Sequence, residues 1–181
     1  MKIRETSLPG VLVLTPTVYR DDRGAFFETF NRRRMAAAGL PENWAQDNVS
    51  FSKKHVLRGI HYQIQQPQGK LVRVTHGTVL DVAVDLRRSS PTFGRHFAIE
   101  LSGENAEMLW IPEGFGHGVL VLSEVAGFAY KVTDYYLPAA ERTIAWNDPD
   151  LAILWPIAAN GVIVSGKDRL GVLLRDAELF P

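Results

Sequence analysis

Short runs of alternating apolar and polar residues, separated by Gly, Pro, Asn and Asp, fill most of this chain. A period of two residues is typical of β-strands with one buried face, and the separating residues favour tight turns. Because the connections are short, the pattern favours a sandwich or barrel over parallel strands joined by helices. The expected strands are residues 11–18, 25–30, 56–63, 71–76, 79–86, 97–101, 108–111, 118–122, 126–134 and 143–146.

Two segments near the N-terminus predict other local structures. Residues 20–24 (RDDRG) lie between the first two expected strands and predict a hairpin in which Gly24 supplies the turn. Residues 31–39 (NRRRMAAAG) predict the one helix of the chain. Asn favours the start of a helix, Ala its interior and Gly its end.

The expected strand at 79–86 has two different faces. One face is wholly apolar, whereas the other carries two acids. Those acids could be solvated, or they could line the polar interior of a small barrel in which a ligand would sit. The strand by itself fits either arrangement. The apolar face consists of Leu80, Val82, Val84 and Leu86, and the other face of Asp81, Ala83 and Asp85.

Composition limits the classes of function. A chain of 181 residues fits one domain, which we expect to span residues 1–181. The 20 Lys and Arg residues balance 20 Asp and Glu residues, so no overall charge favours nucleic acid or an anionic membrane as a partner. The absence of cysteine excludes disulfides, thiolate metal sites and a cysteine nucleophile. Without a signal-like or membrane-spanning apolar run, we expect a cytoplasmic location.

Residues 112–117 (PEGFGH) match a turn that ends in an inward-pointing histidine in cupins, which are small double-stranded β-helix barrels. Metal-binding cupins add two histidines and a glutamate from an earlier strand, but here that strand offers only His61, with Lys70 further along. A catalytic metal generally needs three protein ligands, and a nearby ammonium group would repel the cation. We therefore expect a cupin-like jelly roll without a metal. One short helix and a peripheral C-terminal segment would complete the fold.

His61 and Lys70 are the first candidates for catalytic groups. If Gln63 pairs with Lys70 across a hairpin, then His61 lies opposite Val72, and His61 and Lys70 share one face as diagonal neighbours. A slip of one residue would move Lys70 to the other face. From residue types alone, a histidine satisfied in the core and a lysine at a strand end remain the alternative.

Tyr130 is the third candidate, because the strand at 126–134 places it on the same side as Phe128 and Val132. A strand tyrosine often packs with its hydroxyl at the rim of a sheet, but it can also act as a general acid. A histidine base, a lysine cation and a tyrosine acid around one cavity are what proton transfer next to a carbonyl requires.

Nine motifs of the chain, in order and spacing, closely resemble the dTDP-4-dehydrorhamnose 3,5-epimerase family. Together they extend from residue 21 to residue 168 of the 181 residues. They are DDRGAFFETF (21–30), QDNVSFS (46–52), VLRGIHYQ (56–63), QGKLVRV (68–74), DVAVDLRRSSPTFG (81–94), LWIPEGFGHG (109–118), YKVTDYY (130–136), WNDP (146–149) and SGKD (165–168).

The resemblance implies inversion of C3 and C5 of dTDP-4-keto-6-deoxy-glucose in dTDP-L-rhamnose biosynthesis. It implies that His61 is the general base, that Asp168 orients and supports it, that Tyr130 is the acid, and that Lys70 stabilises the enolate. No redox cofactor is needed for this chemistry, which agrees with the absence of a dinucleotide-binding fingerprint.

The resemblance also implies a homodimer in which N-terminal strands within residues 1–30 are exchanged. Residues from those strands would contact the nucleotide in the neighbouring subunit, and they are Arg23, Phe26 and Glu28. Substrate contacts from the barrel itself would be Gln46, Asn48, Arg58, His117 and Tyr136. Asp81 would lie inside the barrel behind these contacts.

Three alternatives share the same scaffold. One is an epimerase that inverts a single carbon, C3 or C5, of a related keto-deoxy sugar. Another is a sugar 3,4-ketoisomerase, and the third is a barrel that binds a sugar nucleotide without catalysis. The last would not need all four of His61, Lys70, Tyr130 and Asp168, so their joint presence argues against it.

Overall fold

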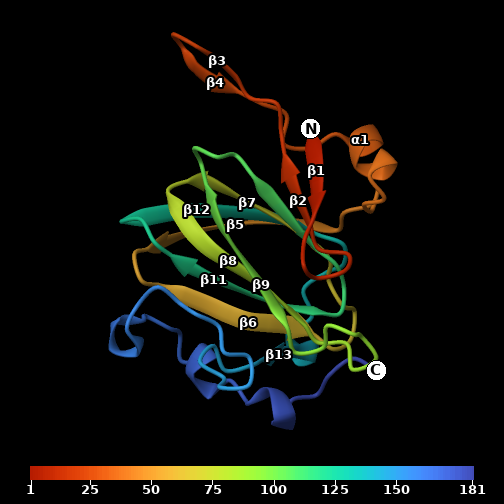
Figure 1. Cartoon of the computed structure of the whole chain (residues 1–181), viewed down its shortest axis with the longest axis vertical. Helices are drawn as coiled ribbons and strands as arrows, with labels where there is room; N and C mark the ends of the chain where they lie inside the picture. The colour runs from red at the N-terminus through yellow and green to blue at the C-terminus, as the bar shows by residue number, and fades with distance from the viewer.

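Two antiparallel sheets face each other and form a barrel, as the computed structural model of residues 1–181 shows (Figure 1). One sheet has the order β1 (Lys2–Glu5), β2 (Leu12–Thr15), β10 (Met108–Ile111), β7 (Lys70–His76), β12 (Val125–Val132) and β5 (Gln46–Lys53). The other has the order β13 (Glu141–Thr143), β6 (Leu57–Gln63), β11 (Phe115–Val121), β8 (Thr78–Asp85) and β9 (His96–Ser102). The predicted all-β, cupin-like fold is confirmed.

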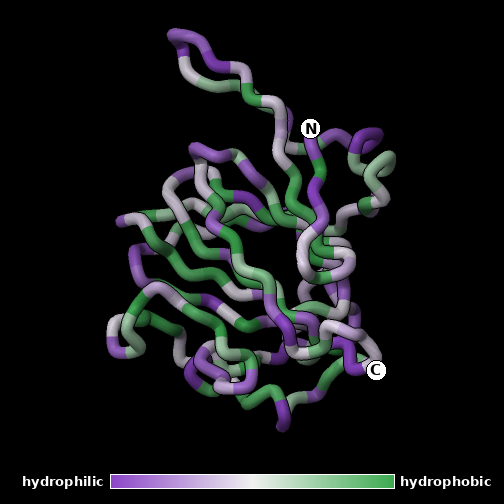
Figure 2. The backbone as a smooth tube through the Cα atoms, in the orientation of Figure 1, coloured by the Kyte–Doolittle hydropathy of each residue, from purple (hydrophilic) through white to green (hydrophobic).

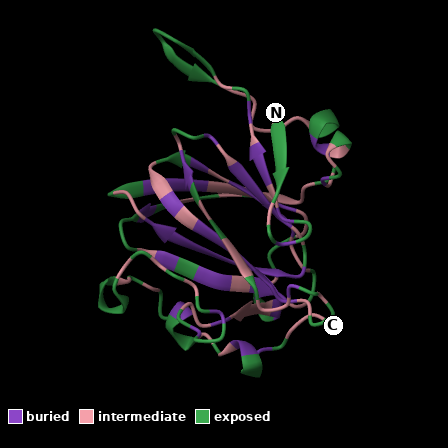
Figure 3. Cartoon of the chain, in the orientation of Figure 1, coloured by how far each residue is buried: buried purple, intermediate pink, exposed green.

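The main hydrophobic core lies between the two sheets, where the strands are mostly buried (Figure 3). Val72 and Leu109 enter it from the first sheet, and Ala83 and Phe115 enter it from the second. Each large apolar side chain that is fully buried contributes about 1.5–3 kcal/mol relative to exposure. The green, hydrophobic stretches of Figure 2 accordingly follow the barrel strands, whereas the purple tip of the N-terminal hairpin is hydrophilic.

The alternation in β8 divides its apolar side chains between two of the three hydrophobic clusters of the molecule. Ala83 faces the core between the sheets, while Val82 and Val84 face outward. The outer face is covered by the C-terminal segment, residues 144–181, through Leu151 and Leu174. The predicted peripheral C-terminal segment is therefore present, and it lies along the outside of the β6 sheet (Figure 1). Its short 3₁₀ helices are η2 (Ala159–Gly161), η3 (Asp168–Leu170) and η4 (Leu174–Asp176), and η1 (Pro138–Ala140) precedes β13.

The N-terminal third contains the predicted helix, and it contains a hairpin at the predicted place whose turn is Asp22–Arg23, with Gly24 as the first residue of the second strand. Helix α1 (Arg32–Ala37) begins where the Asn31 side chain accepts a hydrogen bond of 3.2 Å from the Arg34 backbone N–H. The hairpin is formed by β3 (Tyr19–Asp21) and β4 (Gly24–Phe26), and it projects away from the barrel (Figure 1). No helix of the structure is long and apolar enough to span a membrane.

Several strand predictions are wrong in their limits or partners. Residues 11–18 do not form one arm of the hairpin, because β2 pairs instead with β1 and β10. β1 and β5 were not expected, since both are edge strands with many exposed polar residues. The last expected strand, 143–146, lies earlier as β13, and the chain leaves the sheet after Ile144, which still exchanges backbone hydrogen bonds with Ile60.

The expected hairpin pairing between the His61 and Lys70 strands is also wrong. β6 pairs with β11 and β13, whereas β7 pairs with β10 and β12, so the two strands belong to opposite sheets. The turn between them crosses from one sheet to the other. His61 and Lys70 still face a common space, because each points inward from its own wall of the barrel.

Candidate active site

A cavity of about 210 Å³ opens between the two sheets. Its walls combine inward side chains from strands far apart in the sequence. From the first sheet come Lys70 on β7 and Phe128 and Tyr130 on β12, and from the second come His61 on β6 and His117 on β11. Three of the four predicted catalytic groups therefore line one cavity.

The fourth group, Asp168, lies behind His61 rather than in the cavity wall. Its Oδ1 is 2.5 Å from Nε2 of His61, and its side chain is only 4% exposed. Burial by itself would raise the pKa of Asp168, but the hydrogen bond with His61 and the nearby Lys167 ammonium hold it below its usual value. Asp168 is therefore an ionised partner for an imidazole that is about to accept a proton.

An irregularity in β6 brings Arg58 to the same side as His61. In regular alternation, two residues three positions apart would point to opposite faces. The register of β6 against β11 shifts between His117 and Val119, opposite Gly59. Gly59 has a φ of +124°, and a Cβ there would lie 2.6 Å from the Gly118 backbone, so a larger residue would be excluded. Both Arg58 and His61 consequently line the cavity.

Lys70 is a buried cation. Its Nζ donates a hydrogen bond of 3.3 Å to the Gln68 carbonyl, and the residue is 8% exposed. Desolvation lowers the pKa of Lys70 to about 8, although the Glu141 carboxylate opposes this shift. The ammonium form therefore prevails at neutral pH, but less strongly than for a surface lysine.

Tyr130 faces the cavity from the wall opposite His61, on β12. Desolvation raises the pKa of its phenol, and Glu141 adds to this effect while Arg58 opposes it. The phenol is therefore protonated at neutral pH and can donate a proton. Phe128 packs against it with ring centroids 5.9 Å apart.

His117 and Asp81 form a second buried pair deeper in the barrel. The Asp81 oxygens lie 3.0 and 3.1 Å from Nε2 of His117, and the imidazole stacks on Phe128. The prediction that His117 and Asp81 lie inside the barrel is confirmed in position. No group of three or more His, Cys, Asp or Glu side chains is placed so that it could hold a metal ion.

Of the remaining predicted contacts of the barrel, Tyr136 lines the cavity, whereas Gln46 and Asn48 lie on the neighbouring strand β5 and are not part of its wall. Gln46 donates a hydrogen bond of 2.7 Å to Asn48, and it accepts one of 3.3 Å from the Tyr136 backbone N–H. Asn48 is paired with Tyr130 across the two strands.

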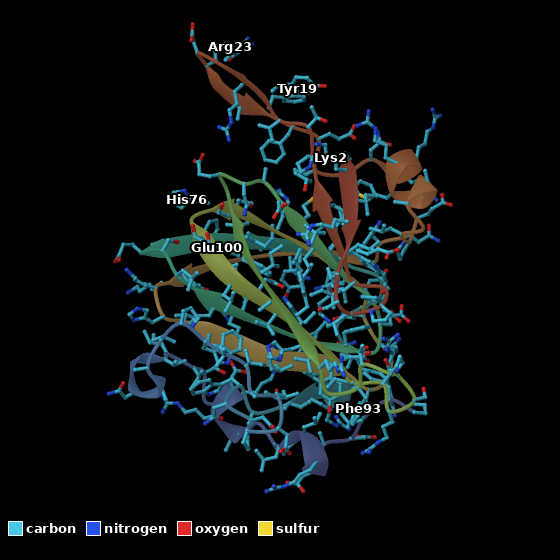
Figure 4. The ribbon with its side chains drawn as sticks, in the orientation of Figure 1. Lys2, Tyr19, Arg23, His76, Phe93 and Glu100 are labelled. Carbon is cyan, nitrogen blue, oxygen red and sulfur yellow. The ribbon has the colours of Figure 1, made fainter.

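The structure does not bring the predicted hairpin residues to this cavity. Figure 4 places Arg23 at the tip of the hairpin, far from the barrel, where its guanidinium pairs with Asp21. Phe26 is 73% exposed, although large apolar side chains are usually buried in folded proteins. Glu28 lies at the base of the hairpin and pairs with Arg34.

Glu141 is a cavity residue that the sequence reasoning missed. It lies on β13, accepts a hydrogen bond of 2.6 Å from the Tyr136 hydroxyl, and forms an ion pair with Lys167. No motif marks it, because a single glutamate beside an arginine reads as a surface charge. Gln63, another unexpected lining residue, ties the segment after β12 to the end of β6 by accepting from the Leu137 N–H.

A cupin-like barrel with a His–Asp pair, a buried lysine and a facing tyrosine defines an enzyme of the proton-transfer type. Comparison with known proteins identifies the class further. The sequence model of the dTDP-4-dehydrorhamnose 3,5-epimerase family matches residues 5–176. The chain belongs to this family, and it is an isomerase that epimerises a sugar. The predicted family and class of enzyme are confirmed.

Individual relatives agree over the full length. The dTDP-4-dehydrorhamnose 3,5-epimerase of Pseudomonas aeruginosa is 53% identical, and the alignment covers 100% of both chains. The crystal structure of the 3,5-epimerase of Legionella pneumophila, in complex with dTDP-4-keto-L-rhamnose, has a TM-score of 0.95. It is 48% identical and covers 98% of this chain and 94% of that one. A 4-keto-6-deoxy sugar epimerase from the novobiocin gene cluster of Streptomyces spheroides is 37% identical, with a TM-score of 0.94 and coverage of 100% and 92%.

Proposed function

We propose that this chain inverts C3 and C5 of dTDP-4-keto-6-deoxy-glucose and so forms dTDP-4-keto-rhamnose for dTDP-L-rhamnose biosynthesis. The observation that supports this most directly is the position of His61 and Tyr130 on opposite walls of one cavity. A base on one side of a sugar ring and an acid on the other are what inversion of a carbon requires. The family of the chain and its similarity to an epimerase bound to dTDP-4-keto-L-rhamnose support the same substrate class.

In this proposal His61 removes the proton from the carbon next to the ketone. Nε2 of His61 is hydrogen-bonded to Asp168, whereas Nδ1 has no hydrogen-bond partner in the chain. We therefore assign Nδ1 as the nitrogen that accepts the proton of the substrate. The electrons of the C–H bond move into the C–C bond, and the ketone becomes an enolate. The Lys70 ammonium stabilises the developing charge on that oxygen. Asp168 stabilises the imidazolium that forms.

Tyr130 then returns a proton to the opposite face of the same carbon, and the enolate reverts to the ketone. The phenolate then takes up a proton from solvent and the His61 imidazolium releases its proton to solvent, which restores both groups for the next inversion. Since the 4-keto group acidifies the C–H bonds on both of its sides, the same base and acid serve C3 and C5 when the ring shifts in the cavity. These steps call for side chains alone, so no cofactor forms part of the proposal.

The substrate's nucleotide is assigned to residues at the mouth of the barrel and to a second subunit. Arg58 presents a guanidinium to the cavity, which suits a pyrophosphate. Tyr136 lines the same cavity, and Gln46 is hydrogen-bonded to the Tyr136 backbone and to Asn48. We further propose a homodimer of single-domain chains in which residues 1–30 reach the partner through the projecting β3–β4 hairpin, while β1 and β2 stay in the sheet of their own chain. Arg23, Phe26 and Glu28 would complete the partner's site. The exposure of Phe26 and the distance of the hairpin from its own cavity support this arrangement. The cytoplasmic location stays a prediction.

Incubation with the 4-keto sugar nucleotide in deuterated water, followed by NMR, tests the reaction. We expect deuterium at both C3 and C5 and the product of double inversion, and we expect His61→Ala to abolish both. Deuterium at one carbon only would replace the proposal by a single-carbon epimerase. A ketone moved to C3 would indicate a ketoisomerase, and tight binding without exchange would indicate a binding protein.

Mixing two impaired variants tests the shared site. His61→Ala removes the base, and Arg23→Ala weakens nucleotide binding when substrate is scarce. If the hairpin serves the neighbouring subunit, a heterodimer of the two contains one intact site. Mixing the variants after reversible dissociation should then restore about a quarter of wild-type activity at low substrate. No recovery beyond the average of the two separate variants would mean that each site is built from one chain.

A further inference from the structure

Glu141 is the one carboxylate in the cavity wall to which the proposed reaction gives no task. It lies on β13, a short strand at the edge of the second sheet, two residues before Thr143, which pairs with His61. Its side chain is only 15% exposed. An acid at such a position is costly unless it is paired, and a negative charge close to a developing enolate would oppose the reaction. Its partners therefore determine what it does.

Two of these partners belong to different parts of the fold. The Tyr136 hydroxyl, from the segment after β12, donates a hydrogen bond of 2.6 Å to Oε2 of Glu141. The Lys167 ammonium, from the C-terminal segment, forms an ion pair with the same carboxylate oxygen. Lys167 directly precedes Asp168. One side chain thus joins a tyrosine at the cavity mouth to the turn that carries the partner of the catalytic base.

Backbone hydrogen bonds attach the chain to the barrel on both sides of the turn around Asp168: the Leu57 N–H donates to the Ile163 carbonyl at 2.9 Å, and the Val172 N–H donates to the Thr143 carbonyl at 3.1 Å. Within the turn, the Asp168 N–H donates to the Ser165 hydroxyl at 3.1 Å, and the Arg169 N–H donates to the Ser165 carbonyl at 3.1 Å. These bonds shape the turn but do not fix it to a strand. The side-chain contacts that reach across to the sheet are Asp168 with His61 and Lys167 with Glu141.

We propose that Glu141 is a positioning residue, which clamps Tyr136 and the Lys167–Asp168 turn to β13 and thereby holds Asp168 against His61. This inference rests on the proposed function for its effect on catalysis. Glu141 touches neither the base nor the acid, and it acts through Lys167 on one side and through Tyr136 on the other. The ion pair with Lys167 also offsets part of the negative charge of the carboxylate, which reduces its repulsion of the enolate.

The charge of Glu141 provides a signature that a purely structural residue would lack. Besides Lys167 and Tyr136, the titratable groups that sense it are His61, Lys70 and Tyr130. The Glu141 carboxylate raises the pKa of Lys70, which desolvation lowers by a larger amount. It also raises the pKa of Tyr130, in the same direction as the larger effect of desolvation. Removing its charge should therefore lower both pKa values, so that activity declines at a lower pH on the alkaline side.

Glu141→Gln and Glu141→Ala distinguish the ion pair with Lys167 from the hydrogen bond with Tyr136. Glu178→Gln is the matched control. The glutamine keeps an acceptor for Tyr136 but loses the charge for Lys167, whereas alanine loses both. Glu178 forms an ion pair with Arg142 between the C-terminal segment and β13, but it does not line the cavity. Its removal thus weakens the same segment without touching the clamp.

We expect Glu141→Gln to lower kcat about tenfold, the effect of losing one charged hydrogen bond, with unchanged affinity for dTDP. Its alkaline decline should begin at lower pH. Glu141→Ala should in addition weaken dTDP binding, because Tyr136 is released. Glu178→Gln should match the wild type in kcat and pH profile. The proposal would be overturned if Glu141→Gln had the kcat of the wild type and lost activity at the same alkaline pH.

Hydrogen exchange keeps the clamp testable whether or not the chain has the proposed activity. Backbone amides of residues 168–171 should exchange faster in Glu141→Gln than in Glu178→Gln or the wild type. Equal exchange in all three proteins would refute the clamp. Failure of the proposed function would appear differently, as an absence of deuterium exchange into the substrate by the wild-type enzyme.

Discussion

Replacing Asp168 by asparagine keeps the size and shape of the side chain but removes the negative charge that supports His61, the base of the proposed reaction. The carboxylate is buried and lies 2.5 Å from Nε2 of His61. An ionised Asp168 accepts the Nε2 proton and leaves Nδ1 free to act as the base. An asparagine can turn its amide N–H₂ toward Nε2, which would favour the tautomer with the proton on Nδ1. The imidazole would then face the substrate in the wrong protonation state.

The size of the loss follows from the bond that is removed. A hydrogen bond to a charged group contributes about 1.5–3 kcal/mol. The imidazolium is stabilised by that amount in the step that forms it, and 1.36 kcal/mol corresponds to a factor of ten in rate. We therefore expect Asp168→Asn to slow proton exchange about 10- to 150-fold. The tautomer effect moves the expected value toward the upper end of this range.

The rate of deuterium appearance at C3 and C5, followed by NMR, measures this loss directly. Asp176→Asn is a suitable control, because it removes a carboxylate from the same segment at an exposed position that pairs only with neighbouring Arg175. We expect the control to exchange at the wild-type rate. If Asp168→Asn is slowed less than about threefold while folded to the same extent, Asp168 does not support the base, and the assignment is wrong.

Other consequences can be checked with single substitutions. Tyr130→Phe should lose most inversion but keep deuterium exchange at the original face, because proton removal does not need the acid; unchanged product formation would contradict its role. Since the pKa of Lys70 is about 8 and its ammonium form is the active one, kcat/KM, whose pH dependence reports the free enzyme, should fall as pH rises through about 8. Lys70→Arg should lack this decline, and a flat wild-type profile well above pH 8 would refute the argument. Desolvation would raise the pKa of Asp85, but hydrogen bonds from Arg87 and its neighbours lower it to about 2. The unfolded value is about 3.9, so this carboxylate stabilises the fold fully above about pH 4 and progressively less as pH falls toward 2. The difference in Tm between wild type and Asp85→Asn should narrow over that range, and a constant difference would show that Asp85 contributes nothing through its charge.

The sequence predicted the barrel because local alternation is sufficient to define most of its strands. The alternation in β8 already separated Ala83 from Val82 and Val84, and the structure places Ala83 in the core between the sheets and the two valines in the outer core. The helix and hairpin followed from single residues with strong local preferences, Asn31 and Gly24. Which strands pair is a long-range property, however, and it was predicted wrongly for β6 and β7. A chain that passes from one sheet to the other leaves no local trace at the crossing.

The candidate site was predicted where family motifs coincide with strands, as for His61, Lys70 and Tyr130. Reasoning from alternation alone would have separated Arg58 from His61, because the irregularity opposite Gly59 is set by the close approach of β11. Glu141 escaped notice for a related reason. Tyr136 and Lys167 both reach Glu141 only after the C-terminal segment has folded back along β13. The hydrophobic pattern of the sequence does not predict this long-range contact.

The order in which parts of the site are made along the chain has a consequence for synthesis. His61 and Asp168 are 107 positions apart, and every barrel strand precedes residue 144. During translation the barrel can therefore assemble while the stretch that holds Asp168 is still inside the ribosome. The nascent barrel would expose the apolar side chains of Val82 and Val84 until that stretch emerges and covers them. The same folding step would therefore cover this apolar surface and bring Asp168 to His61.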